Sequence, residues 1–400
     1  FSDHTVAAVT PIEAMCELFD EKYNGKNFLN SDLALSGMKK NSSLEKFANS
    51  LGANLTQGIS LNSGSLTVEN KKLKPGDAIS ALLVWGDVEL SAAGTVTATE
   101  SSGRFLSFGH SFLKRGQVNY PAAKTFIHDT INSVSFPFKI ASPESIIGTF
   151  TQDRESGIAG TFGYFAQSIA CEFVFENLDS GIKNKYSFRI VADEFLTRSL
   201  LEGIFKGLAE EAWGRKGEGT MLVNLRLESK NIKNGWSRRD IFFDSENVIA
   251  KSFLQSTEII NAFMPQPFSE TMPAGLILTV QATQKPKILA IQEIKAPSKA
   301  KPGDEIEIII ELQGWRTKPF EKKFKMRIPE NASGVCEVVA RGGSVEPMSQ
   351  VSIEEGLMSI NSLERMLNEI KNLDSGNELI IELNSDDFGN ALKKALSGNS

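Results

Sequence analysis

The most constraining feature of this sequence is a series of short runs, between residues 73 and 190, in which apolar and polar residues alternate. The series begins with "LKPGDAISALLVWGDVELSAAGTVTATESSGRFLSFGHSF", where Gly-Asp and Ser-Ser-Gly interrupt the alternation. A period of two residues places successive side chains on opposite faces of a strand. Turns this closely spaced predict several short antiparallel strands, as in a small β-barrel.

Helical spacing replaces the alternation after this region. The segment "ADEFLTRSLLEGIFKGLAEEAW", residues 192–213, predicts a helix that ends at Gly214. Strand and helix patterns then follow one another up to about residue 286, and short alternating runs return up to residue 345. A last helical face and the strand-like "NELIIELN" complete the chain.

These changes of period predict a mainly β fold with α+β parts. The predicted units are, in chain order, a trypsin-like or small β-barrel domain with a closing helix over residues 1–215, an α+β module over residues 216–286, an immunoglobulin-like β-sandwich over residues 287–345, and a helix–strand tail over residues 346–400.

Composition excludes several classes of function. The 400 residues are 41% hydrophobic and 23% charged, which is typical of a globular protein with a sizeable core. The net charge is −6 and no Lys/Arg cluster is interleaved with aromatic residues, so we expect no nucleic-acid partner. No apolar run approaches the ~20 residues that span a bilayer, so we expect no membrane-spanning segment.

Metal and cofactor sites are not indicated either. The three histidines, His4, His110 and His128, lack the spacing of metal ligands, so we expect no metal and no cofactor. The three cysteines are far apart and form no CxxC motif, which excludes a zinc ribbon and leaves one disulfide possible.

Three glycine-containing motifs in the β-rich region carry a family resemblance. They are Gly94-Thr95-Val96-Thr97, Gly109-His110 and Gly157-Ile158-Ala159-Gly160. Together they resemble the SpoIVB-type serine peptidase domain over roughly residues 1–200, as in larger relatives with β-rich extensions. The resemblance implies that His110 is the general base of a trypsin-like site. It also implies a protein or peptide substrate and an extracytoplasmic location, in the periplasm, in the cell envelope or secreted.

The nucleophile of that family is missing from this sequence. In the family it lies in a "GMSGSP"-like segment, and neither that segment nor Gly-Xaa-Ser-Xaa-Gly occurs in the 400 residues. The first residues include "VAAVTPIEAM", which predicts the end of an N-terminal strand that runs into a helix. The same stretch resembles the family segment that follows the serine. We therefore expect the serine to lie upstream of Phe1, and an N-terminal fragment is a candidate partner of this chain.

Other residues compete for roles beside His110. Asp153 and Asp129 are the candidate acids that would orient the imidazole, although turn chemistry or an ion pair with Arg154 also accounts for Asp153. Ser111 is a poor nucleophile for His110, because adjacent strand residues point to opposite faces. His110 itself has a second interpretation, as a structural histidine beside a turn. We expect it at a strand end, with its ring facing a cleft or the N-terminal strand.

Two functions remain open at this point. The first is a serine peptidase fragment that carries the general base but not the nucleophile and is inactive alone. The second is a non-catalytic extracytoplasmic scaffold, built on a degenerate protease fold, that binds or assembles other proteins.

Overall fold

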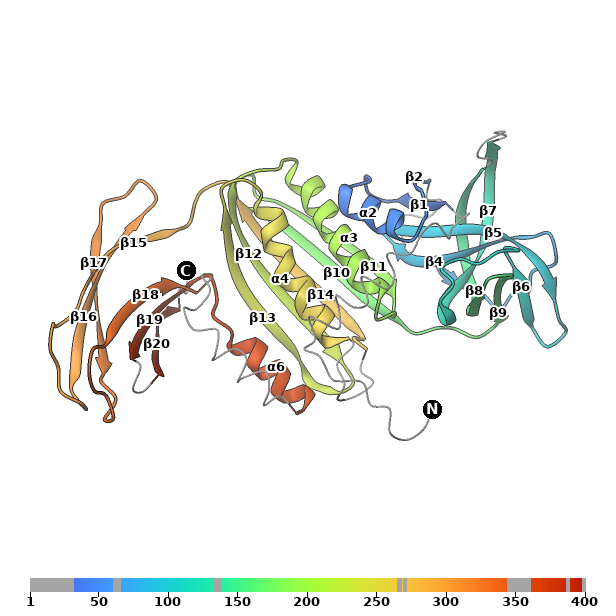
Figure 1. Ribbon diagram of the computed structural model, residues 1–400. Coiled ribbons are helices and arrows are strands. Elements are labelled where there is room, and N and C mark those ends of the chain that lie inside the picture. The colour runs from blue at the N-terminus through green and yellow to red at the C-terminus, as the bar shows by residue number, and fades with distance from the viewer. Residues whose placement is uncertain are drawn as a thin grey trace.

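The computed structural model describes residues 32–59, 66–131, 138–264, 268, 272–343, 361–385 and 389–397. It shows an elongated molecule in which a barrel, a sheet covered by helices and a sandwich follow one another (Figure 1). The fold is mainly β with α+β parts, as predicted. The predicted N-terminal strand and helix lie outside the described residues.

The barrel is a closed ring of six strands in the order β4-β7-β8-β9-β6-β5. The ring closes because β4 pairs with β7 along one edge and with β5 along the other. Buried aromatic rings fill it, and the ring centroids of Phe105 and Phe150 lie 5.3 Å apart. The strands are β4 (Ala78–Gly86), β5 (Glu89–Thr99), β6 (Arg104–Ser107), β7 (Gly116–Ile131), β8 (Phe138–Arg154) and β9 (Gly157–Phe162).

A small β-α-β unit extends the barrel sheet at β5. Its helix is capped by Asn41, whose side chain accepts hydrogen bonds from the backbone N–H groups of Ser43 and Leu44 at 3.0 Å. The unit comprises β1 (Leu33–Ser36), which pairs with β5, α2 (Ser42–Ser50) and β2 (Leu55–Gln57); the short β3 (Thr67–Val68) pairs with β8.

The middle of the molecule is built from two successive hairpin–helix units. Their four strands and a fifth, β14, form a sheet in the order β13-β12-β14-β10-β11. The predicted boundary between residues 215 and 216 falls inside this sheet, because β10 pairs with β14. The elements are β10 (Ser168–Asn177), β11 (Ile182–Val191), α3 (Leu196–Trp213), β12 (Gly219–Ser229), β13 (Ile232–Asp244), α4 (Val248–Phe263) and β14 (Gly275–Thr283).

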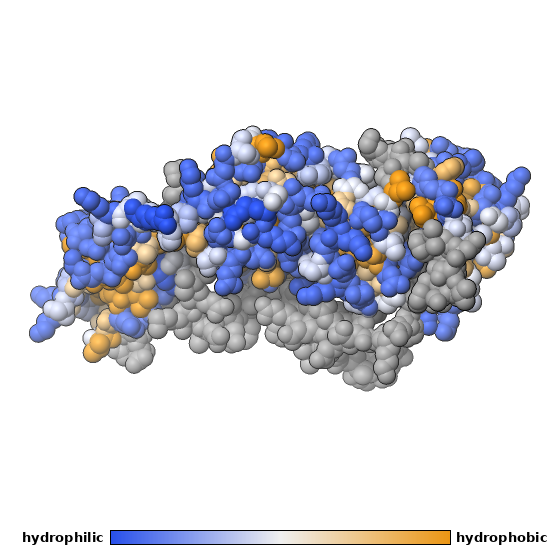
Figure 2. Space-filling model, turned by 90° about the horizontal axis from the view of Figure 1, so that it is seen from above, coloured by the Kyte–Doolittle hydropathy of each residue, from blue (hydrophilic) through white to orange (hydrophobic). Residues whose placement is uncertain are grey.

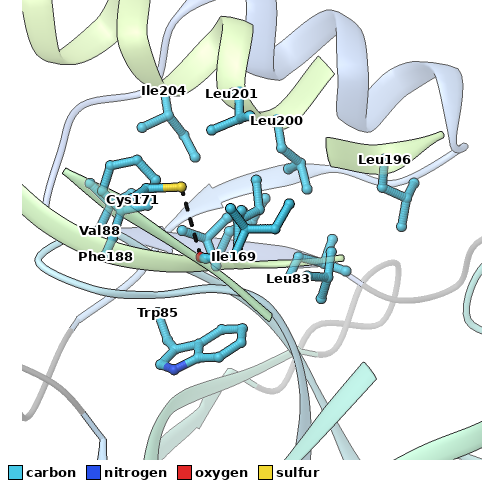
Figure 3. Close-up of a cluster of buried hydrophobic side chains, with 14 of the residues drawn as sticks. Leu83, Trp85, Val88, Ile169, Cys171, Phe188, Leu196, Leu200, Leu201 and Ile204 are labelled. Atoms are coloured by element: carbon cyan, nitrogen blue, oxygen red, sulfur yellow. Dashed lines mark hydrogen bonds between the residues drawn. The ribbon is translucent and has the colours of Figure 1, made fainter. Parts of the chain in front are cut away.

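The two helices cover one face of this sheet. Along β12, Val223 and Leu225 are buried on the covered face, whereas Asn224 and Arg226 are exposed on the other. Figure 3 shows the packing under α3, where Leu200, Leu201 and Ile204 point toward Ile169 and Cys171 of β10. The alternation of burial along each strand follows from the period of two in its sequence.

The C-terminal sandwich packs two three-stranded sheets against each other around an isoleucine-rich core. One sheet comes from the predicted sandwich region, and the other combines its last strand with two strands of the predicted tail. The strands are β15 (Leu289–Lys295), β16 (Glu305–Gly314) and β17 (Phe320–Arg327) in the first sheet, and β18 (Glu337–Gly342), β19 (Glu378–Ser385) and β20 (Gly389–Ser397) in the second.

Helix α6 (Leu363–Asn372) joins the second sheet to the middle of the molecule. The buried guanidinium of Arg238, on β13, donates to the carbonyl oxygens of Ile370 and Leu373 at 3.0 Å. The same group lies 2.9 Å from the buried carboxylate of Asp240. A cation at the C-terminal end of a helix satisfies its last carbonyls and opposes its dipole, so this arginine fixes α6 on the sheet.

The surface seen from above is mostly hydrophilic, and its apolar residues form separate groups, of which the largest lies at the sandwich end (Figure 2). None of the helices in the described part of the chain is long and apolar enough to cross a membrane.

One buried carboxyl stands out in the barrel sheet. Glu89 on β5 lies opposite Ser36 on β1, and both side chains are buried. No described residue forms a hydrogen bond with the Glu89 carboxyl, and the Ser36 hydroxyl is also unpartnered. Burial disfavours the charged form and raises the pKa of Glu89 from 4.5 to about 8.

This carboxyl predicts a pH dependence of stability. Between pH 4.5 and about 8 the unfolded chain has lost the Glu89 proton that the folded chain keeps, so the free energy of unfolding falls as the pH rises. The full loss is roughly 3–5 kcal/mol. We expect urea unfolding of Glu89→Gln to show a markedly smaller decline across this range than the parent chain. The exposed Glu155→Gln is the control; an equal decline in all three proteins would contradict the prediction.

Candidate functional site

His110 lies in the loop that connects β6 to β7. The strand β6 ends at Ser107, and the chain then enters the left-handed region at Phe108 (φ 71°) and Gly109 (φ 74°). No heavy atom lies within 4 Å of a Cβ built on Gly109, so its backbone angle, rather than lack of space, favours glycine there. His110 therefore follows a strand end, as predicted, on a sharply turned backbone.

The left-handed conformation of Phe108 is held by its side chain. The ring packs so closely on Gly94 that a Cβ on that glycine would lie 2.3 Å from it. Its centroid is 6.0 Å from that of Phe150, and the Phe108 N–H donates to the carbonyl of Thr95 at 3.0 Å. A bulky residue with positive φ is strained, and such strain persists only where the surrounding packing imposes it. The barrel core thus sets the direction in which the chain leaves β6.

Asp153 holds the other half of the loop. Its carboxylate is buried and accepts hydrogen bonds from the backbone N–H groups of Phe112 at 2.8 Å and Leu113 at 2.5 Å. The N–H of Arg115 lies 3.5 Å from the same carboxylate. Hydrogen bonds to a charged acceptor are roughly twice as strong as neutral ones. The loop is therefore fixed at two points, the Phe108 ring and the Asp153 carboxylate, with His110 between them.

The imidazole of His110 is half-buried and is held by its own loop. Its Nδ1 lies 2.8 Å from the carbonyl oxygen of Ser111, and its ring makes an edge contact with Phe108 at 5.8 Å. A carbonyl oxygen only accepts hydrogen bonds, so in the neutral ring Nδ1 carries the proton. The lone pair is then on Nε2, which has no hydrogen-bond partner among the described residues. This is the tautomer that a general base requires.

The two acids predicted to orient the imidazole do not contact it. Asp153 accepts hydrogen bonds from loop amides, and the hydrogen-bond partner of His110 Nδ1 is the carbonyl oxygen of Ser111. Asp129 pairs with Ile140 near the opposite end of the β7–β8 ladder from Asp153, and its carboxylate accepts from the N–H of Thr130. The structure therefore assigns Asp153 to the loop backbone and leaves Asp129 on the surface.

A second histidine–serine pair occurs in the barrel, but its hydrogen bond runs in the wrong direction for the histidine to act as a base. The Nε2 of His128 lies 2.9 Å from the Oγ of Ser142. The Ser142 hydroxyl is fully buried and donates its proton to the carbonyl of Ile59. A hydroxyl has one proton, so Ser142 accepts from His128 and has no proton to give it. This pair fastens the chain around residue 59 to the barrel.

The described residues supply neither a nucleophile nor oxyanion donors at His110. No serine, threonine or cysteine side chain in the described ranges forms a hydrogen bond with its imidazole. The loop amides that converge beside it are occupied by Asp153. Burial raises the pKa of the Cys171 thiol far above its usual range, and a buried thiol is not a nucleophile.

Neither a metal cluster nor one of the three main cavities is found at His110 in the described part of the chain. Within the described part of the chain, no group of three or more His, Cys, Asp or Glu side chains could hold a metal ion. Three cavities of about 200, 550 and 710 Å³ are lined by other residues, so none of them provides the expected cleft. The predicted alternative neighbour, the N-terminal strand, lies outside the described residues.

Comparison with known proteins adds no assignment. No model of a known protein family matches the chain, and no curated protein sequence matches it.

Two features of this site were not predicted from the sequence. One is the contact between Phe108 and Gly94, for which the paired motifs "GTVT" and "SFGH" were the only signal. The other is the capture of the loop by Asp153, which lies about forty residues further along the chain. A single sequence shows an aspartate after a strand but not which amides it accepts from.

The role of Asp153 can be tested by substitution. We expect Asp153→Asn to speed hydrogen exchange at the amides of Phe112 and Leu113 and to destabilise the chain by about 1–3 kcal/mol, since charge-assisted bonds are lost in a buried place. Asp129→Asn is the matched control and should change stability by less than about 0.5 kcal/mol. Equal protection of the two amides in the parent and Asp153→Asn would refute the loop assignment.

Proposed function

We propose that this chain is the part of a SpoIVB-like serine peptidase that carries the general base, and that it has no peptidase activity alone. The observation that supports the proposal best is the presentation of His110. A strained backbone, a ring in the barrel core and a buried carboxylate together hold an imidazole whose Nε2 lone pair is unpartnered among the described residues. Such strain is commonly retained where a loop must hold a reacting group.

The reaction that this base would serve needs two further groups. Acyl transfer by a serine requires a hydroxyl within about 3 Å of the base and N–H donors for the developing oxyanion. Neither lies at His110 in the described ranges, and the sequence contains no Gly-Xaa-Ser-Xaa-Gly. In this proposal both come from another segment or chain, the substrate is an unfolded protein or peptide, and the location is extracytoplasmic.

A non-catalytic scaffold is the second candidate, and one observation favours it. The largest of the three cavities, about 710 Å³, is lined by other residues, whereas the half-buried His110 contacts its own loop. In a scaffold the β6–β7 loop would be structural, and the sandwich and helix-covered sheet would serve as binding surfaces. The following labelling experiment separates the two functions.

We expect a fluorophosphonate probe to leave residues 1–400 unlabelled, and to label an extended protein that includes the segment supplying the serine. His110→Ala should abolish that labelling and the cleavage of an unfolded protein, because the base is lost, with a fall of about 10³-fold or more. His128→Gln, at the other half-buried histidine, is the matched control and should retain both.

Two results would decide against the proposal. Labelling of residues 1–400 alone that disappears in His110→Ala would show that the nucleophile is in this chain. An extended protein that is never labelled, or whose labelling survives His110→Ala, would favour the scaffold.

A further inference from the structure

The first sheet of the sandwich leaves apolar side chains uncovered at the end where β16 turns into β17. Along β16 the inner-face residues remain buried as far as Leu312, which is 2% exposed. Phe320 pairs directly with Leu312, and Leu289 lies two residues before Ile291, the other partner of Leu312. Paired residues, and residues two apart along a strand, lie on the same face of a sheet. Leu289 and Phe320 therefore occupy inner-face positions, yet they are 55% and 40% exposed.

Trp315 extends this apolar group onto the turn. Its side chain is 50% exposed, and it follows Gly314, the residue that pairs with Leu289. The turn is closed by Thr317, whose N–H and hydroxyl both donate to the carbonyl oxygen of Gly314 at 3.1 Å. Leu289, Trp315 and Phe320 are here called the sandwich tip. Figure 2 shows the largest apolar group of the surface seen from above at the sandwich end, and exposed apolar groups of this kind mark sites of interaction.

The charges around the sandwich tip are basic and unpaired. Residues 315–327 contain six lysine and arginine residues and one glutamate, in a chain whose net charge is −6. The three basic residues further along β17 are held in ion pairs, which are Lys323–Glu307, Lys325–Glu305 and Arg327–Glu330. The three basic residues nearest the tip, Arg316, Lys318 and Lys322, form no ion pair with any residue that the structure describes. Positive charge is therefore left available only beside the apolar group.

The turn places one of these cations next to the exposed tryptophan. The guanidinium carbon of Arg316 lies 5.3 Å from the Trp315 ring centroid, which is within the range of a cation–π contact. The backbone of Arg316 is in the left-handed region, with φ 56°, which is uncommon for a residue other than glycine. The turn thus presents an aromatic ring and a cation together.

Two properties decide which partner fits the sandwich tip. The unpaired charges are positive, so the partner is anionic. A stable protein interface buries about 800 Å² on each partner, and three partly exposed side chains fall well short of that. A bilayer surface demands less, because tryptophan is favoured at the level of the headgroups and each basic residue adds attraction to anionic lipids.

We propose that the sandwich tip binds the surface of an anionic lipid membrane. Leu289, Trp315 and Phe320 enter the headgroup region, and the three unpaired basic residues contact lipid phosphates. Binding of this kind requires no membrane-spanning segment. The barrel that carries His110 lies at the other end of the elongated molecule (Figure 1), so this proposal and the peptidase proposal can fail independently.

Tryptophan fluorescence of residues 1–400 tests the site directly. The chain has four tryptophans, and the three other than Trp315 are at most 7% exposed, so a lipid-induced change reports on the tip. We expect vesicles of equal parts phosphatidylglycerol and phosphatidylcholine to shift the emission to shorter wavelengths, and brominated acyl chains to quench it. Pure phosphatidylcholine vesicles should do neither, and added salt should weaken the effect of the anionic vesicles.

Co-sedimentation of variants with the anionic vesicles connects the binding to the tip. Lys318→Gln removes one unpaired charge and should weaken partitioning about fivefold. Lys46→Gln, at an exposed lysine on α2, changes the net charge equally and should bind like the parent. Leu289→Gln removes an apolar group and should weaken partitioning about tenfold. Leu254→Gln, at a leucine on α4 that is 49% exposed, is its matched control.

Three results would overturn the proposal. The first is the absence of both a fluorescence change and sedimentation with anionic vesicles, and the second is equal binding to pure phosphatidylcholine. The third is binding that is unchanged in Lys318→Gln and Leu289→Gln. Sedimentation velocity without lipid covers the other occupant, since a concentration-dependent dimer that Leu289→Gln disrupts would assign the tip to a second copy of the chain instead.

Discussion

The fold depends on β4, a strand whose backbone is shared by two units. One edge of β4 pairs with β5 and closes the barrel, whereas the other edge changes partner along its length. Ile79 to Ala81 pair with β7 of the barrel, and Val84 to Gly86 pair with β11 of the helix-covered sheet. A strand with neighbours on both edges and cores on both faces is buried along its length, and seven of the nine residues of β4 are buried in an unbroken run. The buried serine in this run, Ser80, accepts a hydrogen bond from the Thr125 hydroxyl at 2.7 Å. The two units are thereby joined through backbone hydrogen bonds, which leave little freedom for one to move against the other.

The barrel also determines how His110 is presented. Gly94 lies on β5, Phe108 follows β6 and Asp153 is on β8, so three strands of one ring set the course of the loop. The imidazole needs no acid partner for its orientation, because the carbonyl of the next residue defines the tautomer. The same arrangement occupies the amides of Phe112 and Leu113 with Asp153, so these loop N–H groups are not free to bind an oxyanion. A complete hydrolytic site, in this account, requires groups from elsewhere.

The periodicity of the apolar residues made the classes of secondary structure predictable, but it did not make the long-range pairing of strands predictable. The alternating runs predicted a small barrel, and the helical face around Leu200 predicted α3. Both predictions were possible because the spacing of apolar residues within a segment shows which of its faces is buried. The predicted division at residue 215 falls inside one sheet, and this could not be foreseen because the pairing of β10 with β14 depends on the whole sheet. The position of His110 after a strand was predictable from its neighbouring glycine. The partners of Asp153 were not, because hydrogen-bond geometry is not visible in one sequence.

The central claim is that the loop fixes the neutral imidazole of His110 with its proton on Nδ1 and its lone pair on Nε2. Long-range proton–nitrogen NMR spectra of histidine-labelled protein at about pH 9, where an imidazole is ordinarily neutral, measure the tautomer directly. The signal that is lost in His110→Gln identifies the residue. The account predicts a predominantly Nδ1–H form whose proton exchanges slowly with solvent. A predominantly Nε2–H form, or rapid exchange between the two, would contradict it.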